Sequence, residues 1–242
     1  MFFLGRGKGK KSRESNSYKL LVFLVVLAFI VSSIFIVFNV LGRRGVEYPD
    51  FSGFHVYFDS NTSLFKGFKV PVVGSSKARY DVYIFHDLYC SFCAREMVES
   101  LGLIVNSVSD GKIRVAFIDF TVHASQYPEV IRSHALLRST IDTDSLFLSL
   151  MYKAYYRLYS ENKFPDPGFL SSLLNQSNLR VNESIVNEES SIVSALYRVS
   201  LSLGVRGTPT IIIYDREFNT ILNVIEGYQG KDLIERILRG LP

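Results

Sequence analysis

The sequence predicts an α/β domain that carries an inserted block of helices and is preceded by one membrane-spanning helix. Residues 20–41 form a long run without charged residues. Further along, residues 81–86 and 112–120 have the near-continuous apolar character of central strands covered on both faces. Two more strand-like runs, at 210–215 and 220–226, follow a stretch of helical periodicity. Strands and helices that alternate in this way are typical of an α/β domain.

The apolar run at residues 20–41 has the length and composition of a transmembrane helix. Its 22 residues are mostly Leu, Val, Ile and Phe, and as a helix they would extend about 33 Å, against roughly 30 Å for a hydrocarbon core. Six basic residues precede the run and two follow it closely. Because basic residues are retained on the cytoplasmic side, residues 1–19 are predicted to be a cytoplasmic tail, and the residues after the apolar run are predicted to lie outside the cytoplasm.

A cleaved signal peptide is the alternative interpretation of this segment. The apolar region of a signal peptide usually has about 7–15 residues and is followed by a cleavage site of small residues. Here the run is longer, and Gly42-Arg43-Arg44-Gly45 follows it. The sequence therefore favours a retained signal-anchor, single-pass in the cell membrane, for which the lipid bilayer is itself a partner.

The net charge of +4 comes from the N-terminal tail. Residues 1–45 hold eight basic residues and one acid, and the remaining 19 basic and 22 acidic residues leave the outer part at about −3. A domain of this charge does not attract nucleic acid, so no nucleic-acid partner is predicted.

Residues 42–67 are interpreted as a linker and an N-terminal extension, and residues 68–242 as the α/β domain. An insertion of helices is expected over about 124–204, where apolar residues recur at helical spacing. Within it, Thr143-Asp144 would cap one helix, and Pro165 and Pro167 would interrupt the pattern. The expected strands are 55–58, 68–73, 81–86, 112–120, 210–215 and 220–226, and the expected helices are 94–108, 128–138, 143–158, 169–174, 188–203 and 231–238.

The only two cysteines, Cys90 and Cys93, stand between the strand at 81–86 and the helix that follows it. This placement puts Cys90 at a helix N-terminus, where unpaired N–H groups and the helix dipole favour an anion. A thiolate is such an anion, so we expect Cys90 to be the exposed, reactive sulfur. Cys93, one turn further, is expected to be buried and to attack a mixed disulfide formed at Cys90. The pair is predicted to be a redox-active disulfide that needs no other cofactor.

Zinc binding is the competing interpretation of two cysteines at this spacing, but it would require two further ligands. The four histidines are scattered, and none forms a pair at the usual spacing. The sequence therefore predicts no metal. Two cysteines also exclude a framework of structural disulfides.

These motifs, in this order, resemble the thioredoxin fold, and more narrowly the DsbA-like thiol oxidoreductases, which carry a helical domain inside that fold. The resemblance covers roughly residues 68–242. In the tract at 82–93, Val-Tyr-Ile-Phe-His-Asp-Leu-Tyr-Cys-Ser-Phe-Cys, an aromatic strand runs into the cysteine pair. The tract at 202–210, Ser-Leu-Gly-Val-Arg-Gly-Thr-Pro-Thr, looks like the family's cis-proline loop.

The resemblance implies a thioredoxin-like fold and a site built from both tracts. The bond between Thr208 and Pro209 is a suitable cis candidate, because cis peptides are accessible at X–Pro and usually mark a required turn. A cis turn beside the cysteines would expose the Thr208 backbone for pairing with an extended substrate. The implied site residues are Cys90 and Cys93 for catalysis, Thr208 and Pro209 for substrate binding, and His86, Asp87, Ser91 and Phe92 as modulating residues.

The chain departs from the family's pattern around the cysteines. Ser91 and Phe92 stand where oxidases and reductases commonly have a proline or a histidine, and Ile84 stands where members often hold a buried acid. Asp87 would raise the pKa of Cys90 if it lay close. His86 would either offset this effect or simply pack, and we favour packing.

The function we expect is a membrane-anchored, extracytoplasmic thiol:disulfide oxidoreductase that oxidises cysteine pairs of exported proteins. A membrane redox partner, such as a quinone-linked oxidase, would reoxidise it. The same chemistry in the opposite direction would make it a reductase or isomerase fed by a transmembrane reductant. A third hypothesis is a non-catalytic, partner-binding domain with idle cysteines, and the intact cysteine pair and proline loop argue against it.

Overall fold

The computed structural model describes residues 14–42, 48–141 and 146–241. The chain divides into two compact units, residues 1–47 and 48–242. In the first unit, α1 (Glu14–Gly42) includes the whole predicted apolar run, and its side chains are described from 19 to 33, all of them exposed. Among the described residues, no helix meets the length and apolar character of a membrane span. Most of the predicted cytoplasmic tail lies outside the described residues.

The second unit is built on one mixed sheet in which β3 and β4 are central and parallel. The strand order is β1-β2-β4-β3-β5-β6, and all other neighbours are antiparallel. Every residue of β3 and β4 is buried, so the prediction of two central, doubly covered strands is confirmed. The strands are β1 (Val56–Asp59), β2 (Val70–Gly74), β3 (Tyr80–His86), β4 (Ile113–Asp119), β5 (Thr210–Asp215) and β6 (Thr220–Glu226).

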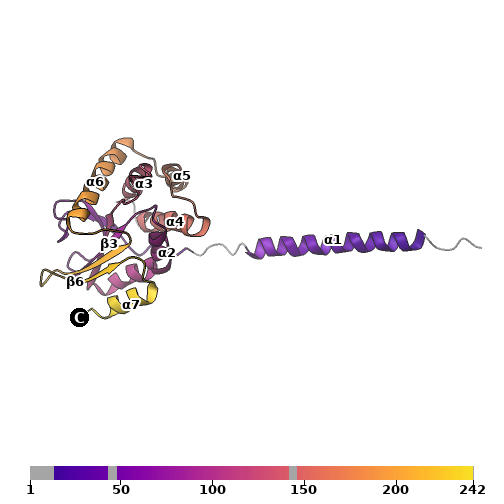
Figure 1. Ribbon diagram of the computed structural model, residues 1–242, viewed down its shortest axis with the longest axis horizontal. Coiled ribbons are helices and arrows are strands. Elements are labelled where there is room, and N and C mark those ends of the chain that lie inside the picture. The colour runs from indigo at the N-terminus through magenta and orange to yellow at the C-terminus, as the bar shows by residue number, and fades with distance from the viewer. Residues whose placement is uncertain (1–13, 43–47, 142–145, 242) are drawn as a thin grey trace, which may run out of the picture. The chain divides into compact units, whose positions relative to one another are not determined.

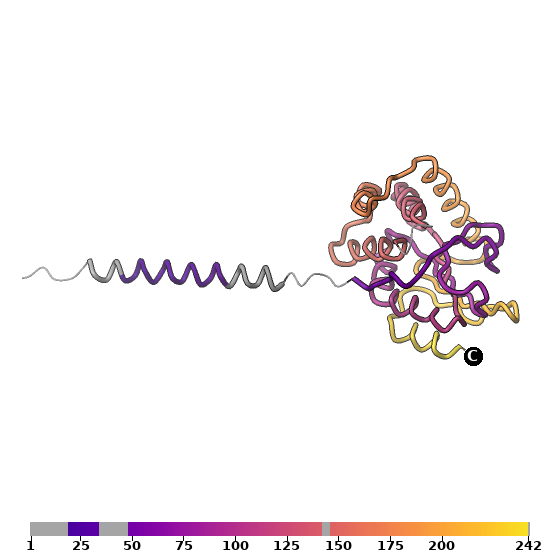
Figure 2. The backbone as a smooth tube through the Cα atoms, turned by 180° about the vertical axis from the view of Figure 1, so that it is seen from behind, coloured from indigo at the N-terminus to yellow at the C-terminus, as the bar shows by residue number. Residues whose placement is uncertain are grey.

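The helical insertion separates β4 from β5 in the chain, as predicted. α2 packs against α4 and α7, and α3 packs against α5 and α6. Figures 1 and 2 show, from opposite sides, that α3, α5 and α6 gather at one end of this unit and α7 at the other. The helices are α2 (Ser91–Asn106), the 3₁₀ turn η1 (Ser107–Asp110), α3 (Glu129–Arg138), α4 (Leu146–Glu161), α5 (Pro167–Gln176), α6 (Glu183–Ser202) and α7 (Lys231–Arg239).

Helix starts differ from the sequence prediction where a capping residue extends the helix. α6 begins five residues before the predicted position 188, because Asn182 accepts the backbone N–H of Ser184 and caps it. α5 begins at Pro167 because Asp166 is its N-cap, so this proline opens the helix as well as separating it from α4. The predicted cap of α4, Thr143-Asp144, lies outside the described residues.

Alternate side chains of β3 enter two hydrophobic clusters on opposite faces of the sheet. Val82 and Ile84 join the cluster under α2, α4 and α7, whereas Tyr83 and Phe85 join the cluster that includes Phe65 and part of α6. A strand with both faces buried is fixed in register, since a shift of one residue would exchange the two faces. The turn that follows His86 is therefore held firmly at the end of the sheet.

Candidate active site

Cys90 is placed by the junction between β3 and α2. After His86 the backbone N–H of Cys90 donates to the carbonyl of Asp87, 3.1 Å away, and this turn leads directly into the helix. Cys90 is the N-cap of α2, and its sulfur accepts the backbone N–H of Cys93 at 3.4 Å. The expected position of Cys90 at a helix N-terminus is confirmed.

The loop before β5 covers the Cys90 sulfur. β5 pairs with β3 so that Thr210 lies opposite Phe85, which brings residues 208–209 against the turn that carries Cys90. The sulfur lies 3.3 Å from the carbonyl oxygen of Thr208, and the Thr208–Pro209 peptide is cis, as predicted. Consequently Cys90 is only 4% exposed and Cys93 is 0% exposed. The prediction of an exposed Cys90 is wrong, although the order of exposure is as expected.

The Thr208 hydroxyl adds a polar group beside both sulfurs. Its oxygen is buried and has no hydrogen-bond partner among the described residues. This side chain is nevertheless among the groups that lower the pKa of Cys90 and of Cys93. A free hydroxyl at this place can donate to whichever sulfur carries negative charge.

The two thiols have opposite pKa shifts. A hydrogen bond from the Cys93 thiol is the largest cause that lowers the pKa of Cys90, and Thr208 and the backbone N–H groups of Cys93 and Phe92 add to it. Together they outweigh burial, and the pKa of Cys90 falls to about 6. Burial, followed by the interaction with Cys90, raises the pKa of Cys93 well above its ordinary value. Near neutral pH the reduced site therefore holds a thiolate at Cys90 and a thiol at Cys93.

Titration of the reduced protein should show this directly. Thiolate absorbance in the ultraviolet should rise with a midpoint near pH 6, and the step should be missing in Cys90→Ser. Because the folded pKa of Cys90 lies below its ordinary value of 9.0, the thiolate stabilises the fold above about pH 9 and this contribution is lost as the pH falls towards 6. The unfolding free energy of the wild type relative to Cys90→Ser should therefore be higher at pH 9 than at pH 6. A single step near pH 9 would contradict the assignment.

Asp87 does not act on Cys90 in the way that its position in the sequence suggests. Its buried carboxylate accepts the backbone N–H and ring Nδ1–H of His123, at 2.9 and 3.0 Å, and the N–H of Tyr89 at 2.8 Å. Burial alone would raise the pKa of Asp87, but these hydrogen bonds outweigh it and hold the pKa below its usual value. The carboxylate thus binds the neighbouring loop, and the expected rise in the pKa of Cys90 is not found.

His123 is a residue near the site that sequence reasoning missed. Its ring is 33% exposed, and the hydrogen bond to Asp87, followed by the charges of Asp87 and Cys90, raises its pKa. An imidazolium therefore forms beside the thiolate more readily than in an isolated histidine. His123 comes near the site because His86 pairs with Asp119 in the parallel strands β3 and β4, which brings the loop after β4 next to the turn after β3.

The two buried histidines, His86 and His134, lie close together, although the sequence separates them widely. His86 packs as we favoured: it is buried, and its Nδ1 lies 2.8 Å from the Tyr155 hydroxyl. His134 accepts the N–H of Leu88 at Nε2 and donates from Nδ1 to Asp119, 2.6 Å away. Burial is the main cause that lowers the pKa of His86 to about 4, so it is neutral.

His86, Asp119 and His134 offer ligand atoms that lie within 4.8 Å of one another, so the fold brings together two histidines that are far apart in the sequence. Both nitrogens of His134 are engaged in hydrogen bonds, and Asp119 also accepts from Arg138 at 2.8 Å. Among the described residues of this cluster, only Nε2 of His86 makes no hydrogen bond, and it lies 3.9 Å from Asp119. A metal would have to break most of these contacts, so the cluster fits a hydrogen-bonded network better than a metal centre.

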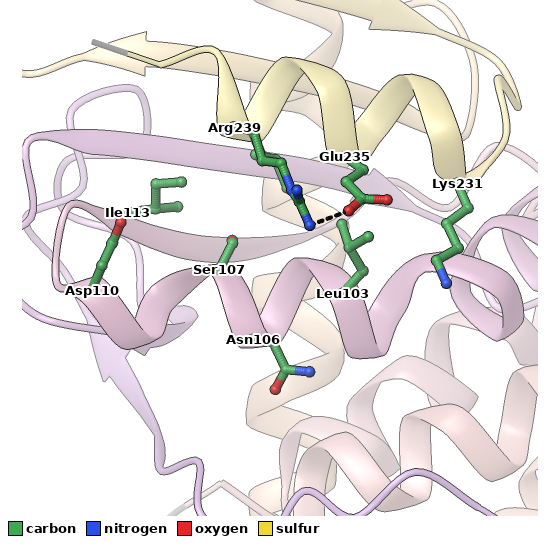
Figure 3. Close-up of a pocket in the computed structure, with 9 residues that line it drawn as sticks. Leu103, Asn106, Ser107, Asp110, Ile113, Lys231, Glu235 and Arg239 are labelled. Carbon is green, nitrogen blue, oxygen red and sulfur yellow. Dashed lines mark ion pairs between the residues drawn. The ribbon is translucent and has the colours of Figure 1, made fainter.

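A pocket of about 500 Å³ lies at the far end of α2 from the cysteines, between α2 and α7. Figure 3 shows Lys231, Glu235 and Arg239 projecting from α7, with an ion pair between Glu235 and Arg239. Asp110 lies on its opposite wall. Its charges are of both signs and none of its lining residues belongs to the predicted site, so the pocket does not contribute to the redox centre.

The remaining predicted residues, Ser91 and Phe92, lie on the first turn of α2 and are exposed.

The site as a whole can keep a thiolate at one sulfur and a thiol at the other, next to a cis-proline loop that leaves the Thr208 carbonyl beside Cys90. This is the chemistry of a protein thiol–disulfide oxidoreductase.

The family model described as Thioredoxin matches residues 69–227, well over half of the chain. The chain therefore belongs to the thioredoxin family. A search of curated protein sequences gave no match.

Several solved structures share the fold of this chain. Alpha-DsbA1 of Wolbachia pipientis superposes with a TM-score of 0.58 and 15% identity, over 71% of this chain and 90% of that chain. The catalytic domain of Proteus mirabilis ScsC superposes with a TM-score of 0.54 and 16% identity, over 74% of this chain and 89% of that chain. Oxidised BdbD of Bacillus subtilis superposes with a TM-score of 0.53 and 19% identity, over 70% of this chain and 91% of that chain. At these identities the likeness establishes the fold.

Proposed function

We propose that this protein is a membrane-anchored, extracytoplasmic oxidoreductase that oxidises cysteine pairs of exported proteins through Cys90 and Cys93. The observation that carries the proposal is that the two thiols at the start of α2 have pKa values shifted in opposite directions. The pKa of Cys90 is lowered to about 6 and that of Cys93 is raised. A stabilised thiolate favours the reduced form of the pair, and a protein whose reduced form is stabilised is an oxidant.

The reaction proceeds in two exchange steps. A substrate thiolate attacks the Cys90 sulfur of the Cys90–Cys93 disulfide, the bond between the cysteines breaks, and Cys93 leaves and takes up a proton. A second substrate thiolate then attacks the substrate sulfur of the mixed disulfide, and Cys90 leaves as a thiolate. Two electrons pass from the substrate to the protein. Of the two protons lost by the substrate thiols, one ends on Cys93 and one in solvent.

Thr208 and Pro209 are the proposed substrate-binding residues. Gly227 donates its backbone N–H to the Pro209 carbonyl at 2.8 Å, so the loop is fixed on the side of β6. On the other side, the Thr208 carbonyl lies 3.3 Å from the reactive sulfur. An extended substrate segment can pair with this backbone while its cysteine reaches Cys90.

The anchor is proposed to be the apolar run at residues 20–41, which lies within α1. The described side chains of α1 are exposed and almost all apolar, and a bilayer would cover them. Six basic residues before the run and two after it favour a cytoplasmic N-terminus. The domain would then lie where dithiols are kept oxidised, close to a membrane oxidase that restores the disulfide.

Topology tests the anchor and the export function together. A protein tagged at both ends should lose its C-terminal tag when protease reaches the outer face of the membrane, whereas its N-terminal tag should survive. Both tags should disappear once the membrane is permeabilised. Survival of the C-terminal tag in intact membranes, with loss of the N-terminal one, would reverse the orientation and remove the basis for an extracytoplasmic oxidant.

A further inference from the structure

Asp87 connects the turn of Cys90 to the loop that follows β4. Its backbone carbonyl accepts the N–H of Cys90 at 3.1 Å, and its buried side chain accepts both the backbone N–H and the ring Nδ1–H of His123, at 2.9 and 3.0 Å. The His123 carbonyl accepts the N–H groups of Gln126 and Tyr127 at 3.0 and 2.9 Å. These bonds fix the His123 ring next to the turn that carries the reactive sulfur.

The His123 ring keeps one nitrogen for proton exchange. An ionised carboxylate only accepts hydrogen bonds, so Nδ1 carries a hydrogen in the bond to Asp87, and Nε2 is the nitrogen that gains or loses a proton. The side chain is 33% exposed, so this proton exchanges with solvent. Neither Ser91 nor Phe92, the two residues between the cysteines, can carry a positive charge. A cation near Cys90 is therefore supplied by the loop after β4.

One of the charges that act on His123 exists in only one redox state. The pKa of His123 is raised first by its hydrogen bond to Asp87 and then by the charges of Asp87 and of the Cys90 thiolate. Burial alone would raise the pKa of Asp87, but its hydrogen bonds hold the pKa below the usual value, and none of them involves a sulfur. The Cys90 charge, by contrast, vanishes when the disulfide forms. The ionisable groups at the neighbouring ends of β3, β4 and α3 are either bonded within the buried network or exposed: His86, Asp119, His134, Arg138 and Glu129.

We propose that His123 is the charge partner of Cys90, which takes up a proton when the Cys90–Cys93 disulfide is reduced and releases it when the disulfide forms again. The proposal rests on the proposed dithiol chemistry but holds for either direction of electron flow. Oxidation of two substrate thiols releases two electrons and two protons. The electrons break the disulfide into a Cys90 thiolate and a Cys93 thiol, and Cys93 holds one proton. His123 holds the second, which would otherwise enter solvent.

The pH range of this coupling follows from its direction. The thiolate raises the proton affinity of His123, and by reciprocity the imidazolium stabilises the thiolate, and hence the reduced form, to the same extent. This stabilisation is complete below the His123 midpoint of the disulfide form, and it is lost as the pH rises through the midpoint of the reduced form. Between the two midpoints, reduction takes up the additional proton. His123 therefore makes the pair more oxidising at low pH than at high pH.

NMR of the histidine rings in full-length protein in detergent tests the coupling. With isotope-labelled histidines, the His123 resonance is assigned from its absence in His123→Asn, and its midpoint is measured in the oxidised and in the reduced protein. We expect the midpoint to be higher in the reduced protein by about half a pH unit, the size typical of a partly exposed pair of opposite charges. Equal midpoints in the two redox states would overturn the proposal.

The reciprocal shift is measured at Cys90 by thiolate absorbance of the reduced variants. His123→Asn removes the charge but keeps an N–H donor for the bond to Asp87, so it should raise the Cys90 midpoint by about half a pH unit. His123→Lys restores a cation and should keep the midpoint low. His55→Asn is the matched control, because His55 is exposed and lies just before the edge strand β1. It should leave the midpoint unchanged.

The variants separate a charge from a structural contact. An unchanged Cys90 midpoint in His123→Asn would overturn the proposal while the proposed function stands, since the wild-type thiolate would still form near pH 6. Equal rises in His123→Asn and His123→Lys would also overturn it, because they would show that the ring only holds the loop. A reduction potential at or below the thioredoxin value would refute the oxidant, and the two coupled midpoints would still establish the role of His123.

Discussion

Replacement of Cys93 with Ala should turn the protein into a trap for its substrates, and replacement of Cys90 with Ala should abolish both exchange and trapping. Cys90 retains its N-cap position in Cys93→Ala, so a substrate disulfide can still react with it. The mixed disulfide then persists, because the thiol that would resolve it from within the protein is gone. Non-reducing gels of the full-length protein should show at least about tenfold more adducts for Cys93→Ala than for Cys90→Ala.

The burial of the two sulfurs explains why the variants should differ so strongly. Cys93 is fully buried and its pKa is raised by that burial, so in Cys90→Ala the remaining sulfur is a protonated thiol with no access to a substrate. In Cys93→Ala the Cys90 sulfur loses one hydrogen bond, but it keeps the helix N-terminus and the Thr208 side chain. Adducts of equal abundance in both variants would show that the nucleophile has been assigned to the wrong cysteine.

Replacement of Arg138 with Met should destabilise the fold by about 3–5 kcal/mol, because it leaves buried acids without their cation. The Arg138 guanidinium, 1% exposed, donates to Asp119 at 2.8 Å and to Glu189 at 2.5 Å. It also donates to the carbonyl of Lys69 at 2.7 Å. These contacts join the end of β4 and the start of β2 to α3 and α6, so they fasten the helical insertion to the sheet. Urea unfolding of the compact unit 48–242 measures the loss.

Arg132→Met is the matched control on the same helix. Arg132 contacts both carboxylate oxygens of Glu183, at 2.8 and 2.9 Å, but the two side chains are 40% and 63% exposed. Ion pairs in solvent contribute about 1 kcal/mol or less. If the two variants lost the same stability, the buried network would have no special role in holding the insertion.

The redox centre could be predicted from the sequence because its signals are local. Each signal defines a conformation within a few residues. The signals are the spacing of Cys90 and Cys93, the apolar strand before them, and the Thr208–Pro209 dipeptide. The degree of burial of Cys90 could not be predicted in the same way. It depends on the loop before β5, which lies 118 residues away in the chain.

The polar network behind the cysteines was missed for the same reason. Asp119 meets His134 and Arg138, 15 and 19 residues further on, and Arg138 meets Glu189, 51 residues further. The available signal was the i, i+4 spacing of His134 and Arg138 on α3, which places two polar side chains on one helix face. Helical spacing does not indicate whether such a face meets solvent or buried acids, so these partners emerge only from the packing of α3 on the sheet.

The reduction potential of the Cys90–Cys93 pair tests the central claim most directly. The lowered pKa of Cys90 stabilises the reduced form, whereas no histidine stands between the cysteines. We therefore predict a potential between about −270 mV, the value for thioredoxin, and about −120 mV, that of a strong oxidant, nearer the middle than either end. Equilibration of the protein with glutathione buffers measures it, and the preoxidised protein should oxidise a reduced, unfolded substrate. A potential at or below the thioredoxin value, with rapid reduction of insulin disulfides, would contradict the account and make the protein a reductase.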